Sequence, residues 1–146
     1  MNSRQRRHNR RGAAIVEMAL VLPIFIMVVM GIIEFGRAMM VSQLVTNAAR
    51  IGARRSIIEG SSNPQVEQAV QDFCATAIGV DPGDVFVTIG ITPLPGNDDP
   101  GNEVGNAQMG DLCTVTVSVP FDKVSYVTGK YLVNKSLTAS CSMQLE

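Results

Sequence analysis

The stretch AAIVEMALVLPIFIMVVMGII, residues 13–33, is an uninterrupted apolar segment of membrane-spanning length. It contains a single charged residue, Glu17. As a helix rising about 1.5 Å per residue it would extend roughly 31 Å, enough to cross the hydrocarbon core of a bilayer. An ionisable side chain inside such a segment is costly, which makes Glu17 a candidate functional residue. We therefore expect a transmembrane segment over residues 13–33.

The charge distribution predicts the orientation of this segment. Residues 1–55 carry nine arginines and two acids, whereas residues 56–146 carry three lysines and eleven acids. Five of the arginines precede the apolar stretch. Because basic residues favour the cytoplasmic side, we expect a single-pass protein of the cytoplasmic membrane with its N-terminus in the cytoplasm and its C-terminal domain extracytoplasmic. This accounts for the basic leader without a nucleic-acid partner, and the lipid bilayer is the expected partner of the apolar stretch.

The pattern beyond the apolar stretch predicts a small α+β fold. Residues 1–12 form a basic leader, expected to be disordered. A continuous helix is expected from about Ala13 to Glu59, with residues 34–60 as its amphipathic continuation. Residues 61–146 are expected to form an extracytoplasmic domain with one short helix, capped by Asn63, and an antiparallel sheet of about three strands. The expected strands cover residues 85–89, 112–119 and 136–145, with a polar loop at 93–111 and a short helix or turn around 123–129.

The start of the apolar stretch combines a basic leader, a glycine and a glutamate at close spacing. Gly12 closes the arginine-rich leader MNSRQRRHNRRG, and Glu17 follows it by five positions. A peptidase at the membrane face needs an accessible, sterically open bond, which Gly12 offers, and cleavage would leave Ala13 as a new N-terminus. Glu17 would then lie one helical turn inside, where its carboxylate could meet the terminal ammonium of a neighbouring subunit and set the register between subunits. The alternative is a Glu that reaches toward the lipid headgroups.

The segment RRGAAIVEMALVLPIFIMVVMGIIEFGRAMM resembles the TadE-like family, minor pilin-like proteins of the tight adherence (Tad) pilus machinery. The similar features are Arg11-Gly12, Val16-Glu17, Leu22-Pro23 and the sequence IEFGR at residues 33–37, together with the closing LTASCSMQLE. The resemblance implies processing by a prepilin peptidase and a structural role in a Tad/Flp-type pilus. It also implies other pilin-like subunits and Tad assembly proteins as partners.

Further candidate residues lie outside the N-terminal helix. Glu34 and Arg37 are spaced i, i+3 at the expected membrane exit, where they could form an ion pair or remain solvated. Cys113 and Cys141 fall on the inward faces of two expected strands and are candidates for a disulfide, with Cys74 as the free thiol. Connectivity does not follow from sequence, and the alternative is three reduced, buried cysteines.

The chain offers little for catalysis. His8 is the only histidine, and it lies in the leader. A nucleophile activated by histidine is thereby excluded in the expected extracytoplasmic domain, residues 61–146. No cofactor or metal site is expected either. We therefore do not expect an enzyme. The alternative to a pilin-like component is a membrane-tethered extracytoplasmic binding module with an uncleaved anchor. In that case an unrelated membrane helix could replace residues 13–33 without loss of function.

Overall fold

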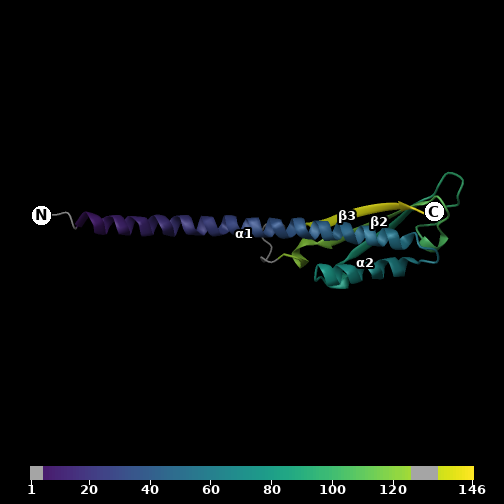
Figure 1. The fold of residues 1–146 in the computed structure, drawn as a ribbon, viewed down its shortest axis with the longest axis horizontal. Coiled ribbons are helices and arrows are strands. Elements are labelled where there is room, and N and C mark those ends of the chain that lie inside the picture. Colours follow the sequence, from purple (N-terminus) through teal and green to yellow (C-terminus); the bar gives the residue numbers. More distant parts are fainter. Residues whose placement is uncertain (1–4, 126–134) are drawn as a thin grey trace. The chain divides into compact units, whose positions relative to one another are not determined.

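The computed structural model describes residues 5–125 and 135–146, with side chains from residue 12 onward. The regular elements are helices α1 (Gln5–Ser56) and α2 (Asn63–Ala77) and strands β1 (Phe86–Thr92), β2 (Leu112–Pro120) and β3 (Ser136–Gln144) (Figure 1). Three single-turn 3-10 helices connect them: η1 (Pro82–Asp84), η2 (Val104–Asn106) and η3 (Phe121–Lys123). These elements confirm the predicted α+β fold class.

The chain divides into two compact units, an N-terminal unit (Met1–Gly36) and a C-terminal unit (Arg37–Glu146). Helix α1 contributes to both, because it continues without a break from Gln5 to Ser56. It passes through Pro23, where the missing backbone N–H removes one hydrogen bond of the helix.

Helix α1 begins earlier and ends earlier than predicted. The leader was expected to be disordered, yet residues 5–12 are helical. Gln and Arg are good helix formers, and extending an existing helix costs far less than nucleating one. At the other end the helix stops at Ser56 rather than Glu59. Two turns follow: in the first the Ile58 N–H donates to the Arg55 carbonyl, and in the second the Ser61 N–H donates to the Ile58 carbonyl.

The sheet of the C-terminal unit is antiparallel with strand order β1-β2-β3. Its central strand β2 alternates between buried and half-buried residues, and its fully buried side chains are Cys113, Val115, Val117 and Val119. The flanking strand β3 alternates exposed Ser, Thr and Gln with half-buried apolar residues. This alternation is the period-two pattern of a sheet with one face on a core and one face in solvent.

The second part of α1 packs on the core together with α2. Its fully buried residues are small or β-branched, and they are Val41, Val45, Ala48, Ala49 and Ala53. Helix α2 contributes Val66, Val70 and Cys74 to the same core. Gly52 lies where α1, α2 and β2 meet, since a Cβ atom there would lie 2.8 Å from both Val115 Cγ1 and Val70 Cγ2. The absence of a side chain at Gly52 therefore lets the three elements approach closely.

Helix α2 begins differently from the prediction. Ser62 is the N-cap and Pro64 occupies the first turn. The side chain of Asn63, predicted to cap, bridges instead to the loop after β1: its Oδ1 accepts from the Val104 N–H at 2.9 Å and its Nδ2 donates to the Asn102 carbonyl at 3.0 Å. Gly79 adopts φ of 80° directly after the last turn, as glycine does at helix C-termini.

The polar loop between β1 and β2 is organised around the fully buried Asp111. Its carboxylate accepts hydrogen bonds from the backbone N–H groups of Gln108 (2.8 Å) and Leu94 (2.9 Å) and from Asn97 Nδ2 (2.6 Å). These donors, the Gln108 N–H first, hold the pKa of Asp111 below its ordinary value. As the prediction of a polar loop implied, it contains no strand, and its one helical turn is η2.

Candidate assembly surface on the N-terminal helix

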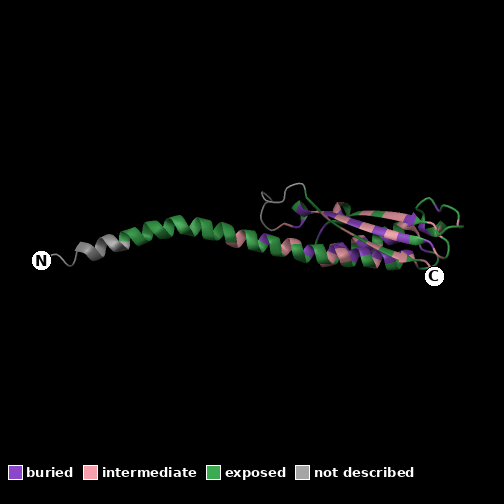
Figure 2. Cartoon of the chain, turned by 90° about the horizontal axis from the view of Figure 1, so that it is seen from above, coloured by how far each residue is buried: buried purple, intermediate pink, exposed green. Residues whose placement is uncertain are grey.

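The N-terminal unit presents its apolar side chains to the outside. From Gly12 to Val28 every residue is exposed (Figure 2). Large side chains such as Ile15, Leu20 and Phe25 expose 60–70% of their surface. Burying an aliphatic or aromatic side chain of this size is worth about 1.5–3 kcal/mol, so this surface is suited to lipid or to other apolar helices rather than to water.

Helix α1 contains a segment that is long and apolar enough to cross a membrane. One apolar N-terminal helix of this kind fits single-pass membrane anchoring. The twelve Leu, Ile, Val and Phe side chains in residues 13–33 favour insertion by about 5 kcal/mol on an insertion scale, whereas one central charge costs about 3 kcal/mol. Glu17 therefore does not prevent insertion, but it carries a cost that a partner would relieve.

The predicted processing residues Gly12 and Ala13 lie within α1, not before it. Both are exposed, and a Cβ atom placed on Gly12 would meet no other atom within 4 Å. No other element of the described part of the chain therefore covers this peptide bond. A peptidase that needs an extended substrate would first unwind this turn, which glycine makes easier.

Glu17 is exposed and follows Ala13 by four residues on the same helix. Residues four apart lie on one helix face, separated by about 6 Å along the axis. The structure therefore puts the predicted register residue and the predicted new N-terminus on the same face. Its neighbour Met18 is 66% exposed and lies on another face, which makes it a suitable control position.

Arg37 has a role that sequence reasoning missed. Its Nε donates to the Val124 carbonyl at 3.1 Å and its Nη2 donates to the Ile78 carbonyl at 3.2 Å. Ile78 is the C-cap of α2 and Val124 is the C-cap of η3, where carbonyl groups lack partners within the helix. Arg37 therefore ties α1 to two helix ends that lie 41 and 87 residues away in sequence. Glu34, three residues earlier on α1, is buried rather than solvated, and its pairing with Arg37 stays a prediction.

The three cysteines, all within the described residues, have free thiols. The disulfide expected between Cys113 and Cys141 is therefore not found. Strand register explains this, because Cys113 is opposite Met143 and Cys141 is opposite Val115. The two cysteines are diagonal neighbours, for which the usual separation exceeds that of a disulfide. Burial raises the pKa of Cys74 to about 11 and also raises the pKa of Cys113, so both favour the protonated thiol.

In a comparison with known protein families, the model of the family described as TadE-like protein matches residues 12–54 of the chain. No curated protein and no solved structure matches the chain. The matched segment runs from the open Gly12 through the apolar surface and Arg37 to the part of α1 that packs in the core. The resemblance noted from the sequence is thereby confirmed over residues 12–54, where the chain is similar to the TadE-like family.

Proposed function

We propose that this protein is a single-pass, pilin-like component of a Tad/Flp-type pilus assembly system, with a structural rather than a catalytic role. The observation that supports this most is the coincidence of two features over the same residues. The exposed apolar part of α1, with Glu17 near its start, falls inside the segment that is TadE-like. A helix of this kind can move from lipid into a bundle of similar helices without exposing apolar surface to water.

In this proposal the leader stays in the cytoplasm and the C-terminal unit lies outside the cytoplasmic membrane. A prepilin peptidase cleaves between Gly12 and Ala13, where no other described element covers the helix. Removal of residues 1–12 takes away five arginines that would otherwise hold the N-terminus at the cytoplasmic face. The helix is then free to leave the bilayer, and Ala13 carries a terminal ammonium.

Glu17 then supplies the contact between subunits. Its carboxylate pairs with the Ala13 ammonium of a neighbouring helix, and the low dielectric of the apolar bundle makes this pairing strong and dependent on position. Because Ala13 and Glu17 are about 6 Å apart along one helix, pairing between helices fixes their axial offset. The partners are other pilin-like subunits and Tad assembly proteins.

Substitution of Glu17 tests the register contact. We expect Glu17→Ala and Glu17→Gln to insert into the membrane at normal levels, because both remove a charge from an apolar segment. Both variants should fail to enter filaments, measured by immunoblotting of sheared pili, while Met18→Ala should assemble normally. Normal assembly of Glu17→Gln would show that the negative charge is not required and would overturn this part of the proposal.

A further inference from the structure

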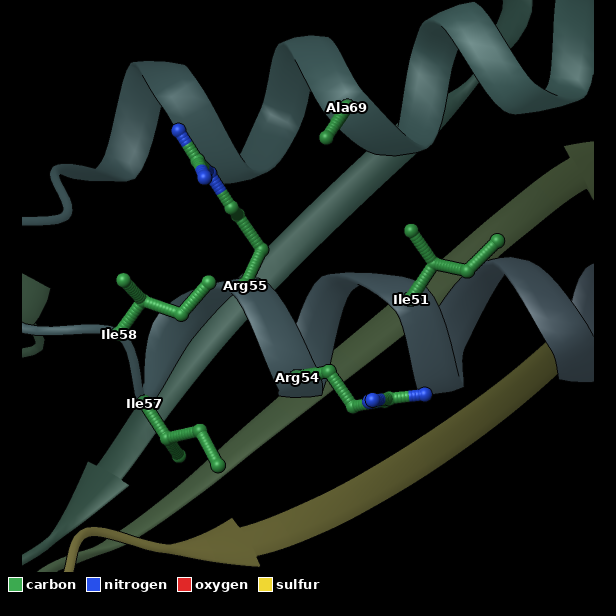
Figure 3. Close-up of a pocket in the computed structure, with 6 residues that line it drawn as sticks. All are labelled: Ile51, Arg54, Arg55, Ile57, Ile58 and Ala69. Atoms are coloured by element: carbon green, nitrogen blue, oxygen red, sulfur yellow. The ribbon is translucent and has the colours of Figure 1, made fainter.

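A hollow of about 500 Å³ opens on the surface of the C-terminal unit, where α1 ends and α2 begins (Figure 3). Its apolar lining comes from Ile51, Ile57 and Ile58 of α1 and the following turn, and from Ala69 of α2. Ile58 is 50% exposed, which is high for an isoleucine in a packed unit. The hollow therefore offers apolar surface that the unit does not cover itself.

Arg54 and Arg55 line the same hollow. Figure 3 shows Arg55 reaching across from α1 toward α2, while Arg54 lies along α1. Both are exposed, and within residues 12–125 and 135–146 neither forms a salt bridge. The hollow is thus a positively charged, apolar site in a unit, Arg37–Glu146, that carries eleven acids against seven basic residues.

The other end of α2 carries the complementary features. Asp81, Asp84 and Asp122 gather around Lys123, whose ammonium lies 3.1 Å from the Asp84 carboxylate and feels the charge of all three acids. One lysine balances three acids there, so this cluster keeps a negative charge. Two residues after Asp84, the side chain of Phe86 is 59% exposed on the solvent face of β1.

We propose that the hollow between α1 and α2 binds a second copy of this chain, which inserts Phe86 between the isoleucines and places its acidic cluster against Arg54 and Arg55. Charge complementarity supports this occupant, because each copy carries both the basic hollow and the acidic cluster. An aromatic ring that fills an apolar pocket, with charge pairs at the rim, is also a common anchor of protein interfaces.

The positions of the two surfaces give this contact a direction. The hollow reaches Ala69 in the middle of α2 and the acidic cluster follows the end of this helix, so the eight residues from Ala69 to Ala77 separate them by about 12 Å. When the hollow of one copy binds the acidic cluster of the next, the pair still has one unoccupied hollow and one unoccupied acidic cluster. Such a contact adds copies in series, as a filament requires, and in this respect the inference rests on the proposed function.

Photo-crosslinking of the full-length protein in its native membrane tests the contact. We would place a benzophenone amino acid at position 58 (Ile58→p-benzoylphenylalanine) and map the crosslinked peptides by mass spectrometry. The expected product is a dimer joining position 58 to the peptide around Phe86. Products that join position 58 to position 58, or to a different protein, would overturn the proposal, as would the absence of any crosslink.

Variants then test which side chains make the contact. We expect Phe86→Ala to reduce the dimer yield about fivefold, the loss expected of a side chain worth about 1 kcal/mol at an interface. Thr88→Ala, at an exposed position on the same face of β1, should leave the yield unchanged. Arg55→Glu should lower the yield, and co-expression with Asp122→Lys copies should restore it in the mixed dimer. Equal effects of Phe86→Ala and Thr88→Ala, or no restoration, would contradict the proposed pairing.

These outcomes are distinct from a failure of the proposed function. If the chain is processed at Gly12 and enters filaments while the crosslink is absent, the head-to-tail contact is wrong and the pilin-like role stands. If the crosslink forms in a chain that is neither processed nor assembled, the contact is right and the pilin-like role is wrong.

Discussion

At the scale of single residues, some charged side chains in this protein have hydrogen-bond partners within their own unit and others are exposed on apolar surfaces. Arg37 is satisfied within its own unit, because its guanidinium reaches two carbonyl groups at helix ends. Asp111 is also satisfied internally, by two backbone N–H groups and one amide. Glu17, Arg54 and Arg55 are exposed on surfaces that are otherwise apolar. We infer that the first two stabilise the fold and the last three meet partners.

Asp111 makes stability depend on pH in the acid range. Its folded-state pKa is lowered, so its stabilising effect is complete above the ordinary aspartate pKa of about 4 and is lost as pH falls through the folded value. We expect Asp111→Asn to melt at a lower temperature than the parent at pH 7 in detergent, with the difference narrowing toward pH 3. Asp98→Asn, exposed on the same loop, should melt like the parent at both pH values. An Asp111→Asn variant with unchanged melting at pH 7 would contradict the structural role.

The cysteines should differ in reactivity. Cys74 and Cys113 are fully buried with raised pKa values, whereas Cys141 is half-buried. We expect iodoacetamide at pH 8 to modify Cys141 first in the folded protein and all three in denaturant, because the thiolate is the reactive form. Peptide mass spectrometry over a time course measures this. Modification of Cys74 as fast as Cys141 would contradict the described burial.

At the scale of elements, helix α1 serves two environments with one continuous backbone. Its residues 13–33 are apolar on all faces, and its second part buries one face of small and β-branched residues against β2 and α2. Side-chain periodicity is a local property, so it predicted α1, α2 and the three strands. The bounds of α1 and the strands differ from the prediction by at most three residues, except at the start of α1, where the difference is eight residues.

Contacts between residues distant in sequence were not predicted. Arg37 bonds to carbonyls 41 and 87 residues away, and Asn63 bonds to a loop about 40 residues away. The Asp111 network depends on the loop conformation as a whole. The expected disulfide failed for a related reason: alternation assigned both cysteines to the inward face correctly, but only the register between β2 and β3 decides which residues are opposite.

Gly52 provides a test of packing between elements. A methyl group there would lie 2.8 Å from the side chains of Val115 and Val70, and β-branched side chains have little freedom to move aside. Overpacking costs about 1–3 kcal/mol, whereas replacing a helical glycine by alanine gains about 1 kcal/mol, so Gly52→Ala should destabilise the C-terminal unit. Gly36→Ala, on the same helix with no atom within 4 Å, should not. Thermal unfolding monitored by circular dichroism compares the two, and a Gly52→Ala variant as stable as Gly36→Ala would contradict the close approach.

At the scale of the whole molecule, the two units offer different surfaces for contact. The N-terminal unit offers an apolar helix for lipid or for other helices, and the C-terminal unit folds around its own core with a basic hollow at one end of α2 and an acidic cluster at the other. On this account the helix assembles subunits and sets their register, and the C-terminal units add a directional contact. In the proposed function, processing at Gly12 is the step that allows the first of these contacts to form.

The most direct test of the central claim is the intact mass of the membrane-extracted protein from cells with and without the prepilin peptidase. We expect the mass to fall by residues 1–12 only where the peptidase is present, which leaves Ala13 as the N-terminus one helical turn before Glu17. The same unprocessed mass in both strains would contradict the account, and residues 13–33 would then serve as a permanent anchor for the C-terminal unit.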